Sequence, residues 1–227
     1  MSIKRMFLVP RNIVWGRGSI EYLESISAEK AVIITDKTLV KLGIESKVES
    51  YLKKAVREVI VFDEVEQEPS IHTVMRAVAE NRSFDPDLII GLGGGSCIDA
   101  AKAFRVFLEN PQFSFEEIRY LDSPPKTSIP PFRKTSFVAI PSTSGTGSEV
   151  SHVAIITDPT IPAKCPLISP VLQPTIAILD PDVADSMPAI VATHTGIDAL
   201  SHAIESYVCI NANNYSRGPA ARATALI

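Results

Sequence analysis

The sequence is poor in cysteine and contains no long uninterrupted apolar run. Its 227 residues include 3 cysteines, Cys97, Cys165 and Cys209, an odd number at wide spacing. This pattern excludes a disulfide framework and favours the reducing cytoplasm. No apolar run approaches the roughly 18 residues of a membrane span, and residues 1–12 lack the apolar core of a signal peptide. The sequence therefore predicts a cytoplasmic chain that has no membrane segment.

The chain also lacks an excess of basic residues. It has 22 Lys and Arg against 26 Asp and Glu, for a formal net charge of -4. Nucleic-acid-binding domains usually carry a basic footprint, so nucleic acid is not an expected partner. Hydrophobic residues make up 45% and charged residues 21%, as in ordinary globular proteins. The length suits one large domain, or one and a half.

Short apolar runs alternate with helix-like stretches over the first 180 residues. We expect strands at 31–35, 59–62, 88–92, 137–140, 154–157 and 175–179. We expect helices at 39–52, 70–80 and 99–108. Such alternation is typical of βαβ units and a parallel sheet. Residues 111–134, rich in proline and polar residues, read as a surface excursion, and proline-rich linkers separate the last two strands.

Only helical spacing follows Asp180 and Pro181. We place a domain boundary here, with residues 1–185 as an α/β domain and residues 186–227 as the beginning of an incomplete helical domain. Residues 218–227 resemble the first turns of a helix without a C-cap glycine. We therefore expect the chain to stop inside an element, as a truncated protein would.

A glycine turn follows the strand at 88–92 and leads into a helix. Glycines let backbone N–H groups approach an anion, and a helix N-terminus adds free donors and a favourable dipole. Gly94, Gly95 and Ser96 are thus candidate phosphate ligands. The turn departs from the dinucleotide fingerprint, because Ser96 takes the place of the last glycine. The alternative is a tight strand-to-helix turn that binds nothing.

Asp36 lies at the carboxyl end of an early strand, where ligands of open α/β sheets gather. A carboxylate there can accept hydrogen bonds from a ribose diol and repel a 2′-phosphate. The alternative is an N-cap for the following helix, for which Asp is a favoured residue.

A hydroxyl-rich loop follows the strand at 137–140. Thr143, Ser144 and Thr146 lie among glycines and could donate to phosphate or sugar oxygens. The alternative is a generic Ser/Gly turn.

Asp198 and His202 are four residues apart in a helical pattern, so they share one helix face. A carboxylate beside an imidazole is half of a divalent metal site, although a complete site needs three or four ligands. The alternative is an ordinary ion pair along the helix. Of the other histidines, His72 and His152 are expected to be structural or exposed, and His194 is expected just ahead of the helix.

In this order, the motifs resemble those of the iron-containing alcohol dehydrogenases. The matching segments are TDKTL at 35–39, GGGSCIDAAK at 93–102, AIPSTSGTGSE at 139–149, ITD at 156–158, LDP at 179–181 and GIDALSHAIE at 196–205. The resemblance covers nearly the whole chain and is strongest to the branch of butanol dehydrogenases and bifunctional aldehyde-alcohol dehydrogenases.

The resemblance implies a dehydroquinate synthase-like fold, in which a Rossmann-like NAD-binding domain precedes an all-α metal-binding domain. It implies hydride transfer between a primary alcohol or aldehyde and NAD(H), with Fe²⁺, or Zn²⁺ or another divalent ion, in a homodimer or higher homo-oligomer. It implies that Asp36 contacts the adenosine ribose, that Gly94, Gly95 and Ser96 contact the pyrophosphate, and that Asp99 lies on the nicotinamide side. It also implies that the nucleotide is contacted by Thr143, Ser144, Thr146 and Lys164, and that the metal is bound by Asp198 and His202.

Two departures from the family pattern leave alternatives open. The family's other two metal ligands are histidines farther downstream than Ile227, and His194 replaces a residue that is usually small or acidic. The alternatives are a zinc-type polyol dehydrogenase, such as a glycerol dehydrogenase, and a catalytically incomplete nucleotide-binding fragment.

Overall fold

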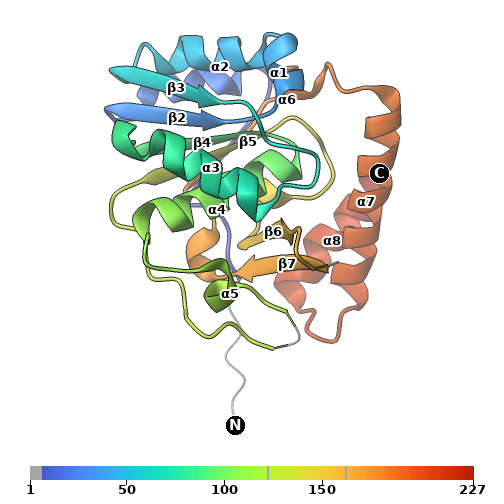
Figure 1. Cartoon of the computed structure of the whole chain (residues 1–227). Coiled ribbons are helices and arrows are strands. Elements are labelled where there is room, and N and C mark those ends of the chain that lie inside the picture. The colour runs from blue at the N-terminus through green and yellow to red at the C-terminus, as the bar shows by residue number, and fades with distance from the viewer. Residues whose placement is uncertain (1–6, 122, 162) are drawn as a thin grey trace.

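A computed structural model describes residues 7–121, 123–161 and 163–227 of the chain. Its centre is a six-stranded, fully parallel sheet with strand order β1-β8-β5-β4-β2-β3 (Figure 1). The strands are β1 (Asn12–Trp15), β2 (Lys30–Ile34), β3 (Glu58–Phe62), β4 (Leu88–Gly93), β5 (Ser136–Pro141) and β8 (Ile176–Leu179). The predicted α/β class is confirmed, as are five of its strands. The four-residue edge strand β1 was missed, because it is too short and too exposed to show a periodic pattern.

Alternate residues of the central strands enter two hydrophobic cores, one on each face of the sheet. Ala31 and Ile33 pack with 3-10 helix η1 (Ser19–Ser25) and helix α2 (Ile44–Leu52). Val32 and Ile34 pack on the opposite face with α3 (Ile71–Asn81) and α4 (Gly95–Glu109). Because successive side chains of a strand point to opposite faces, a sheet buried on both faces needs such continuous apolar runs.

The chain reverses its direction across the sheet between β2 and β4. Helices α1 (Lys37–Lys41) and α2 connect β2 to β3 on one face, and α3 returns the chain to β4 on the other. Ligands of open α/β sheets bind at such a switch point, outside the carboxyl ends of the strands. The ends of β2 and β4 are therefore the place to look for a site.

The helices at these strand ends differ from expectation at their boundaries. The stretch 39–52 forms two helices, because Gly43 adopts the left-handed conformation between α1 and α2. Helix α4 begins at Gly95 instead of residue 99, with Gly94 as its N-cap. The glycine turn is thus the first turn of the helix itself.

A separate antiparallel hairpin packs on α4. Strand β6 (Val153–Asp158) was predicted, but its partner β7 (Ala163–Ile168) lies in a segment that we interpreted as a linker, which was wrong. Pro166 hid the alternation in which Cys165 and Leu167 are buried and Lys164 and Ile168 are exposed. The hairpin forms one wall of the site described below.

The excursion at 111–134 is only partly a surface feature. It contains the short helix α5 (Phe115–Ile118), which begins with a capping box of Ser114 and Glu117. Phe115, Ile118 and Ile129 are buried in the same core as α4. Three apolar residues separated by polar ones give no periodic signal, so this contribution to the core was missed.

The helical spacing predicted after Pro181 is confirmed, and it forms the helices α6 (Pro181–Ala184), α7 (Ala189–Val208) and α8 (Asn214–Leu226). Helix α7 starts after Pro188, so His194 lies inside it and the expected position ahead of the helix was wrong. Helix α8 starts before Gly218, since Asn213 forms a capping box with Ser216. In the described part of the chain, no helix is long and apolar enough to cross a membrane.

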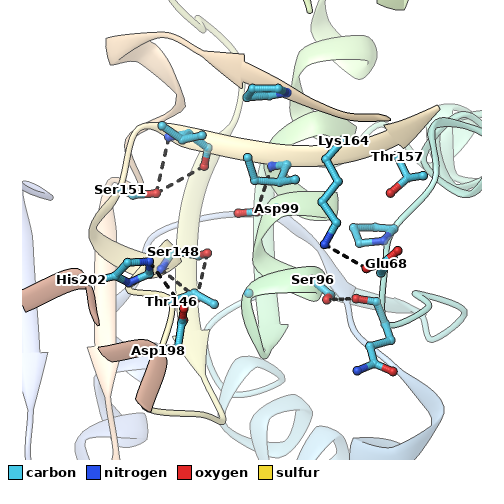
Figure 2. Close-up of a pocket in the computed structure, with 16 residues that line it drawn as sticks. Glu68, Ser96, Asp99, Thr146, Ser148, Ser151, Thr157, Lys164, Asp198 and His202 are labelled. Carbon is cyan, nitrogen blue, oxygen red and sulfur yellow. Dashed lines mark hydrogen bonds and ion pairs between the residues drawn. The ribbon is translucent and has the colours of Figure 1, made fainter. Parts of the chain in front are cut away.

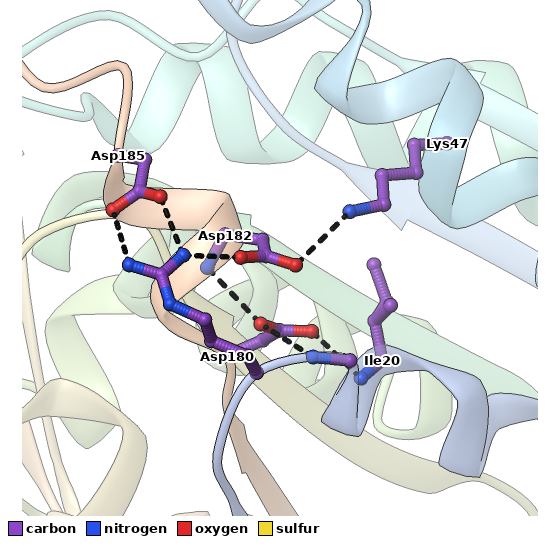
Figure 3. Close-up of polar contacts among 7 residues, drawn as sticks. Ile20, Lys47, Asp180, Asp182 and Asp185 are labelled. Carbon is purple, nitrogen blue, oxygen red and sulfur yellow. Dashed lines mark hydrogen bonds and ion pairs between the residues drawn. The ribbon is translucent and has the colours of Figure 1, made fainter.

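The segment between the sheet and α7 is fixed by acidic side chains (Figure 3). Asp180 is 2% exposed and accepts hydrogen bonds from the backbone N–H groups of Gly18 (3.2 Å) and Ile20 (3.0 Å). The Arg17 guanidinium contacts Asp182 at 2.5 Å and Asp185 at 2.6 Å. These contacts hold the N-terminal segment against the entry to α7, next to the switch point.

Candidate functional site

Two cavities lie on either side of the N-terminus of α4. The Asp36 cavity has a volume of about 450 Å³ and the Asp198 cavity a volume of about 610 Å³. Both are lined by Gln67 and Ser96, so the first turn of α4 separates them. The two cavities thus lie next to each other at a helix N-terminus.

The glycine turn leaves the start of α4 open to a ligand. Gly94 caps the helix through its backbone, and no described side chain supplies a cap hydrogen bond. A Cβ on Gly95 would lie 2.8 Å from Thr146 Oγ1, and one on Gly94 would lie 3.5 Å from Thr143 Oγ1. The hydroxyl of Ser96 donates to the carbonyl oxygen of Gln67. Gly94 and Gly95 thus bring the hydroxyl loop against the helix start, where anions bind most readily.

Asp36 acts as the N-cap that one reading of the sequence proposed. Its Oδ1 accepts hydrogen bonds from the N–H groups of Thr38 (2.7 Å) and Leu39 (3.1 Å), and Oδ2 lies 3.4 Å from Cys97 Sγ. Burial raises the pKa of the Cys97 thiol well above its usual value, and the neighbouring Asp36 adds to this effect. Because Asp36 also lines its cavity, capping leaves a role toward a ribose diol open.

The hydroxyl loop contributes to both cavities. Thr143 lines the Asp36 cavity and Thr146 the Asp198 cavity, whereas exposed Ser144 is not among the described residues that line either. Between them, a Cβ on Gly145 would lie 2.7 Å from Thr195 Cβ of α7. This glycine therefore allows the loop to pack directly against the helix that carries Asp198 and His202.

Asp99 lines the Asp198 cavity, and its carboxylate is almost entirely buried. The residue is 7% exposed, and its Oδ2 accepts a hydrogen bond from the N–H of Ile155 at 2.9 Å. Its Oδ1 has no hydrogen-bond partner among the described residues. Burial raises the pKa of Asp99, and the ammonium of Lys102, 3.7 Å from Oδ1, opposes that rise. A buried acceptor without a partner is rare in folded proteins, so this oxygen is suited to a ligand donor.

Lys164 lines the Asp198 cavity from the hairpin side. Its Nζ lies 2.9 Å from Oε1 of Glu68, which lines the same cavity (Figure 2). Figure 2 shows this pair on one side of the cavity and Asp198 with His202 on the other. Both members of the Lys164–Glu68 pair are largely exposed, so the pair itself adds little stability.

Asp198 and His202 meet on α7, as their spacing predicted. His202 Nε2 lies 3.6 Å from Asp198 Oδ1, and the side chains are 50% and 42% exposed. Both line the cavity, whereas His72, His152 and His194 are not among its described lining residues. The structure shows no group of three or more His, Cys, Asp and Glu side chains within its described residues that could hold a metal ion. This pair thus provides one oxygen donor and one nitrogen donor, and a metal site needs at least one more protein ligand.

Several lining residues escaped the sequence analysis. Gln67 and Glu68 follow β3, so the rule that ligands gather at strand ends could have found them. Met187 and Val191 enter the Asp36 cavity from the segment around the start of α7. Their contribution depends on how the segment after β8 brings the start of α7 to the Asp36 cavity, for which the sequence has no local signal.

Comparison with known proteins places these features in a family. The family model described as iron-containing alcohol dehydrogenase matches residues 10–181. The chain is 42% identical over 204 residues to an NADPH-dependent butanol dehydrogenase of Clostridium saccharobutylicum, covering 89% of this chain and 51% of that protein. It is 39% identical over 226 residues to an aldehyde-alcohol dehydrogenase of Streptococcus pneumoniae, covering 96% and 26%.

The fold comparison agrees with the sequence comparison. The structure of an iron-containing alcohol dehydrogenase from Thermococcus thioreducens superposes with a TM-score of 0.90 at 35% identity, covering 96% of this chain and 58% of that one. The chain thus spans about half the length of the butanol dehydrogenase. On the strength of these matches, the chain belongs to the iron-containing alcohol dehydrogenase family.

Proposed function

We propose that this chain provides the coenzyme-binding part and two metal ligands of an NAD(H)-dependent alcohol dehydrogenase that interconverts primary alcohols and aldehydes. The observation that carries the proposal is the pair of cavities that meet at the open N-terminus of α4. One cavity contains the Asp36 carboxylate, and the other contains Asp99, Asp198 and His202. A dinucleotide has two halves joined by a pyrophosphate, which is the shape that this arrangement fits.

In this proposal the adenosine half lies in the Asp36 cavity and the nicotinamide half in the Asp198 cavity. The Gly94–Ser96 turn supplies N–H donors to the pyrophosphate, and Thr143 and Thr146 line the two halves. Asp99 Oδ1 supplies the acceptor for the carboxamide of the nicotinamide. Ser144 is exposed and is not among the described lining residues of either cavity. We therefore propose that it affects the nucleotide only indirectly, through the packing of its loop.

Asp36 favours NAD over NADP in this proposal, because its charge repels a 2′-phosphate. A similar butanol dehydrogenase from Clostridium saccharobutylicum is NADPH-dependent and one from Thermotoga maritima is NADH-dependent, so relatives differ in their coenzyme. Comparing the NAD⁺ and NADP⁺ affinities of Asp36→Asn tests the preference of this chain.

Asp198 and His202 suit a divalent cation such as Fe²⁺ or Zn²⁺, since carboxylate and imidazole are both ligands for such ions. When bound, the cation supplies Lewis acidity toward the alcohol oxygen, and the nicotinamide supplies the hydride acceptor. The chain's own residues position the two halves of the coenzyme and form the cavity wall between the hairpin and α7. Lys164 and Glu68 close the far side of that cavity.

A second candidate function is coenzyme binding without turnover. It is favoured by the absence, among the described residues, of a third donor near Asp198 and His202. Under this reading the 227-residue chain binds NAD(H) but retains iron weakly.

We also propose the predicted boundary near residue 185, with coenzyme binding before it and metal binding after it. Exposed apolar side chains on β1, α7 and α8, such as Trp15, Val208 and Leu226, support self-association, with a homodimer as the default. Sedimentation at increasing concentration tests this, and a monomer throughout would reject it.

Three free cysteines in the structure support a reducing, cytoplasmic location.

Calorimetric titration of the full 227-residue chain with NAD⁺, ADP-ribose and inorganic phosphate tests the proposed function. We expect saturable binding of one NAD⁺ and one ADP-ribose per chain, each excluding the other, and much weaker binding of phosphate. A folded chain that binds neither nucleotide would reject the proposal.

A further inference from the structure

Lys102 is among the largest fully buried side chains of the described residues, and it carries an ammonium group. The residue is 1% exposed and lies two turns into α4, beyond the glycine turn. Burying an unpaired charge is costly, so such a group persists only where it is fully hydrogen-bonded or paired. The contacts of Lys102 thus show what its charge stabilises.

All three hydrogen bonds of the Lys102 ammonium go to one short segment. Nζ donates to the carbonyl oxygens of Ser148 (2.8 Å) and Val153 (2.7 Å) and to the hydroxyl of Ser151 (3.1 Å). These three partners all line the Asp198 cavity. The segment joins the hydroxyl loop to strand β6, which is also held to α4 by the hydrogen bond from the Ile155 N–H to Asp99. Lys102 therefore shapes the cavity wall without lining it.

The same ammonium lies 3.7 Å from the partnerless Oδ1 of Asp99, one turn earlier on α4. Asp99 is nine-tenths buried, and burial raises its pKa, whereas the charge of Lys102 lowers it. Conversely, burial lowers the pKa of Lys102 to about 8, and Asp99 and Glu149 oppose this shift. Each group thus favours the charged form of the other.

Other charged or titratable groups face this pair from each neighbouring element. They are Glu149 of the 3-10 helix η3 (Ser148–Val150), His152 ahead of β6, Lys164 of β7, and Asp198 and His202 of α7. Lys164 is engaged by Glu68, and His202 lies beside Asp198. Lys102 is therefore the cation placed to balance Asp99.

We propose that Lys102 is a positioning residue for the nicotinamide end of the coenzyme: it anchors the Ser148–Val153 wall and keeps Asp99, which lines the same cavity, as an ionised acceptor. This inference rests on the proposed function, because the ligand donor is taken to be the nicotinamide carboxamide. Lys102 itself touches no ligand in this arrangement. Its effect should therefore be confined to ligands that carry the nicotinamide.

The test compares NAD⁺ with ADP-ribose, which lacks the nicotinamide, in calorimetric titrations of the full chain. We expect Lys102→Met to weaken NAD⁺ binding by about tenfold or more, the value of a charge-assisted hydrogen bond, and ADP-ribose binding by at most about threefold. Lys102→Arg keeps the charge and should stay within about threefold of the parent for both ligands. Lys53→Met replaces an exposed lysine at the C-cap of α2; it is the matched control and should change neither.

The pH dependence separates charge balance from simple packing. Loss of NAD⁺ affinity on acidification should occur at higher pH in Lys102→Met than in the parent, because Asp99 then protonates more readily. Asp99→Asn should remove this dependence. The double variant Asp99→Asn/Lys102→Met, which buries no charge, should bind NAD⁺ as Asp99→Asn does, and it keeps the test available if Lys102→Met does not fold.

Equal losses of NAD⁺ and ADP-ribose in Lys102→Met, or additive effects of Asp99→Asn and Lys102→Met, would overturn the inference. So would a parent chain whose affinity is the same for both ligands. A parent chain that binds neither ligand would instead reject the proposed function, so the two failures are distinguishable.

Discussion

The Asp36 carboxylate combines a structural contact with a proposed role in coenzyme binding. Its Oδ1 caps α1, and the residue lines the cavity that we assign to adenosine. Both readings of the sequence thus apply to the same carboxylate, and a useful test must separate its hydrogen bonds from its charge. Asparagine does so, because its carbonyl oxygen caps a helix as well as Asp does.

Asp36→Asn should shift the ratio of NAD⁺ to NADP⁺ affinity toward NADP⁺ by about tenfold, or roughly 1.4 kcal/mol. The cap persists, so the thermal unfolding midpoint should change little. Glu116→Gln, which removes an exposed carboxylate on α5, serves as the control for net charge. An unchanged ratio in calorimetric titrations would mean that Asp36 does not discriminate between the coenzymes.

Gly95→Val should abolish NAD⁺ binding while the circular dichroism spectrum stays that of the parent. The added Cβ would lie 2.8 Å from Thr146 Oγ1, so the hydroxyl loop must move away from the start of α4. Gly218→Ala on α8, where a Cβ meets nothing within 4 Å, is the matched control. Retained affinity in Gly95→Val would remove this turn from the proposed site.

For single residues, the sequence predicted those whose role depends on residues a few positions away along the chain. The glycine turn, the cap at Asp36 and the Asp198–His202 pair are all defined within a few positions. Lys102 was missed as a separate feature, because its partners lie about 50 positions away and its type alone suggests an exposed side chain.

The same division holds for helices and strands. Long periodic segments such as α3 and β4 were predictable, since their apolar spacing is continuous. Strand β7 was missed because Pro166 interrupts its alternation, and the buried part of the 111–134 excursion has no period. Both segments pack in the core that contains α4, and their local sequence gives no sign of that contact.

Glu109 closes that excursion, and its removal should measure how firmly the segment is held. Its carboxylate accepts hydrogen bonds from the N–H groups of Arg133 (2.9 Å) and Thr135 (2.9 Å) and from the Thr135 hydroxyl (2.6 Å). Burial alone would raise the pKa of Glu109, but these hydrogen bonds outweigh it and lower the pKa. A lowered pKa means that this stabilisation is complete above the unfolded value of about 4.5 and is lost as pH falls through the folded value.

Glu109→Gln should therefore lower the free energy of unfolding at neutral pH by about 1 kcal/mol, after allowance for solvent screening of a partly exposed group. The difference from the parent should shrink on acidification below about pH 4.5. Urea unfolding at several pH values measures this, with Glu80→Gln on the exposed side of α3 as the control. A pH-independent difference would show that the charge of Glu109 is irrelevant to the segment.

For the whole molecule, the question is whether two metal ligands are enough. A catalytic site needs at least three protein ligands with an open position, and the described residues place two at the cavity. We expect the 227-residue chain, reconstituted anaerobically with Fe²⁺, to retain less than one iron per chain and to form no NADH from short primary alcohols. Metal analysis after gel filtration and an absorbance assay test this. Stoichiometric iron with steady turnover would show that another group completes the site.

The central claim is that one coenzyme spans both cavities across the N-terminus of α4. A crystal structure of this chain with NAD⁺ tests it most directly. The account predicts the pyrophosphate at the N–H groups of Gly94–Ser96, the adenosine ribose at Asp36 and the nicotinamide carboxamide at Asp99 Oδ1. A coenzyme bound in the opposite orientation, or with its pyrophosphate away from this turn, would contradict the account.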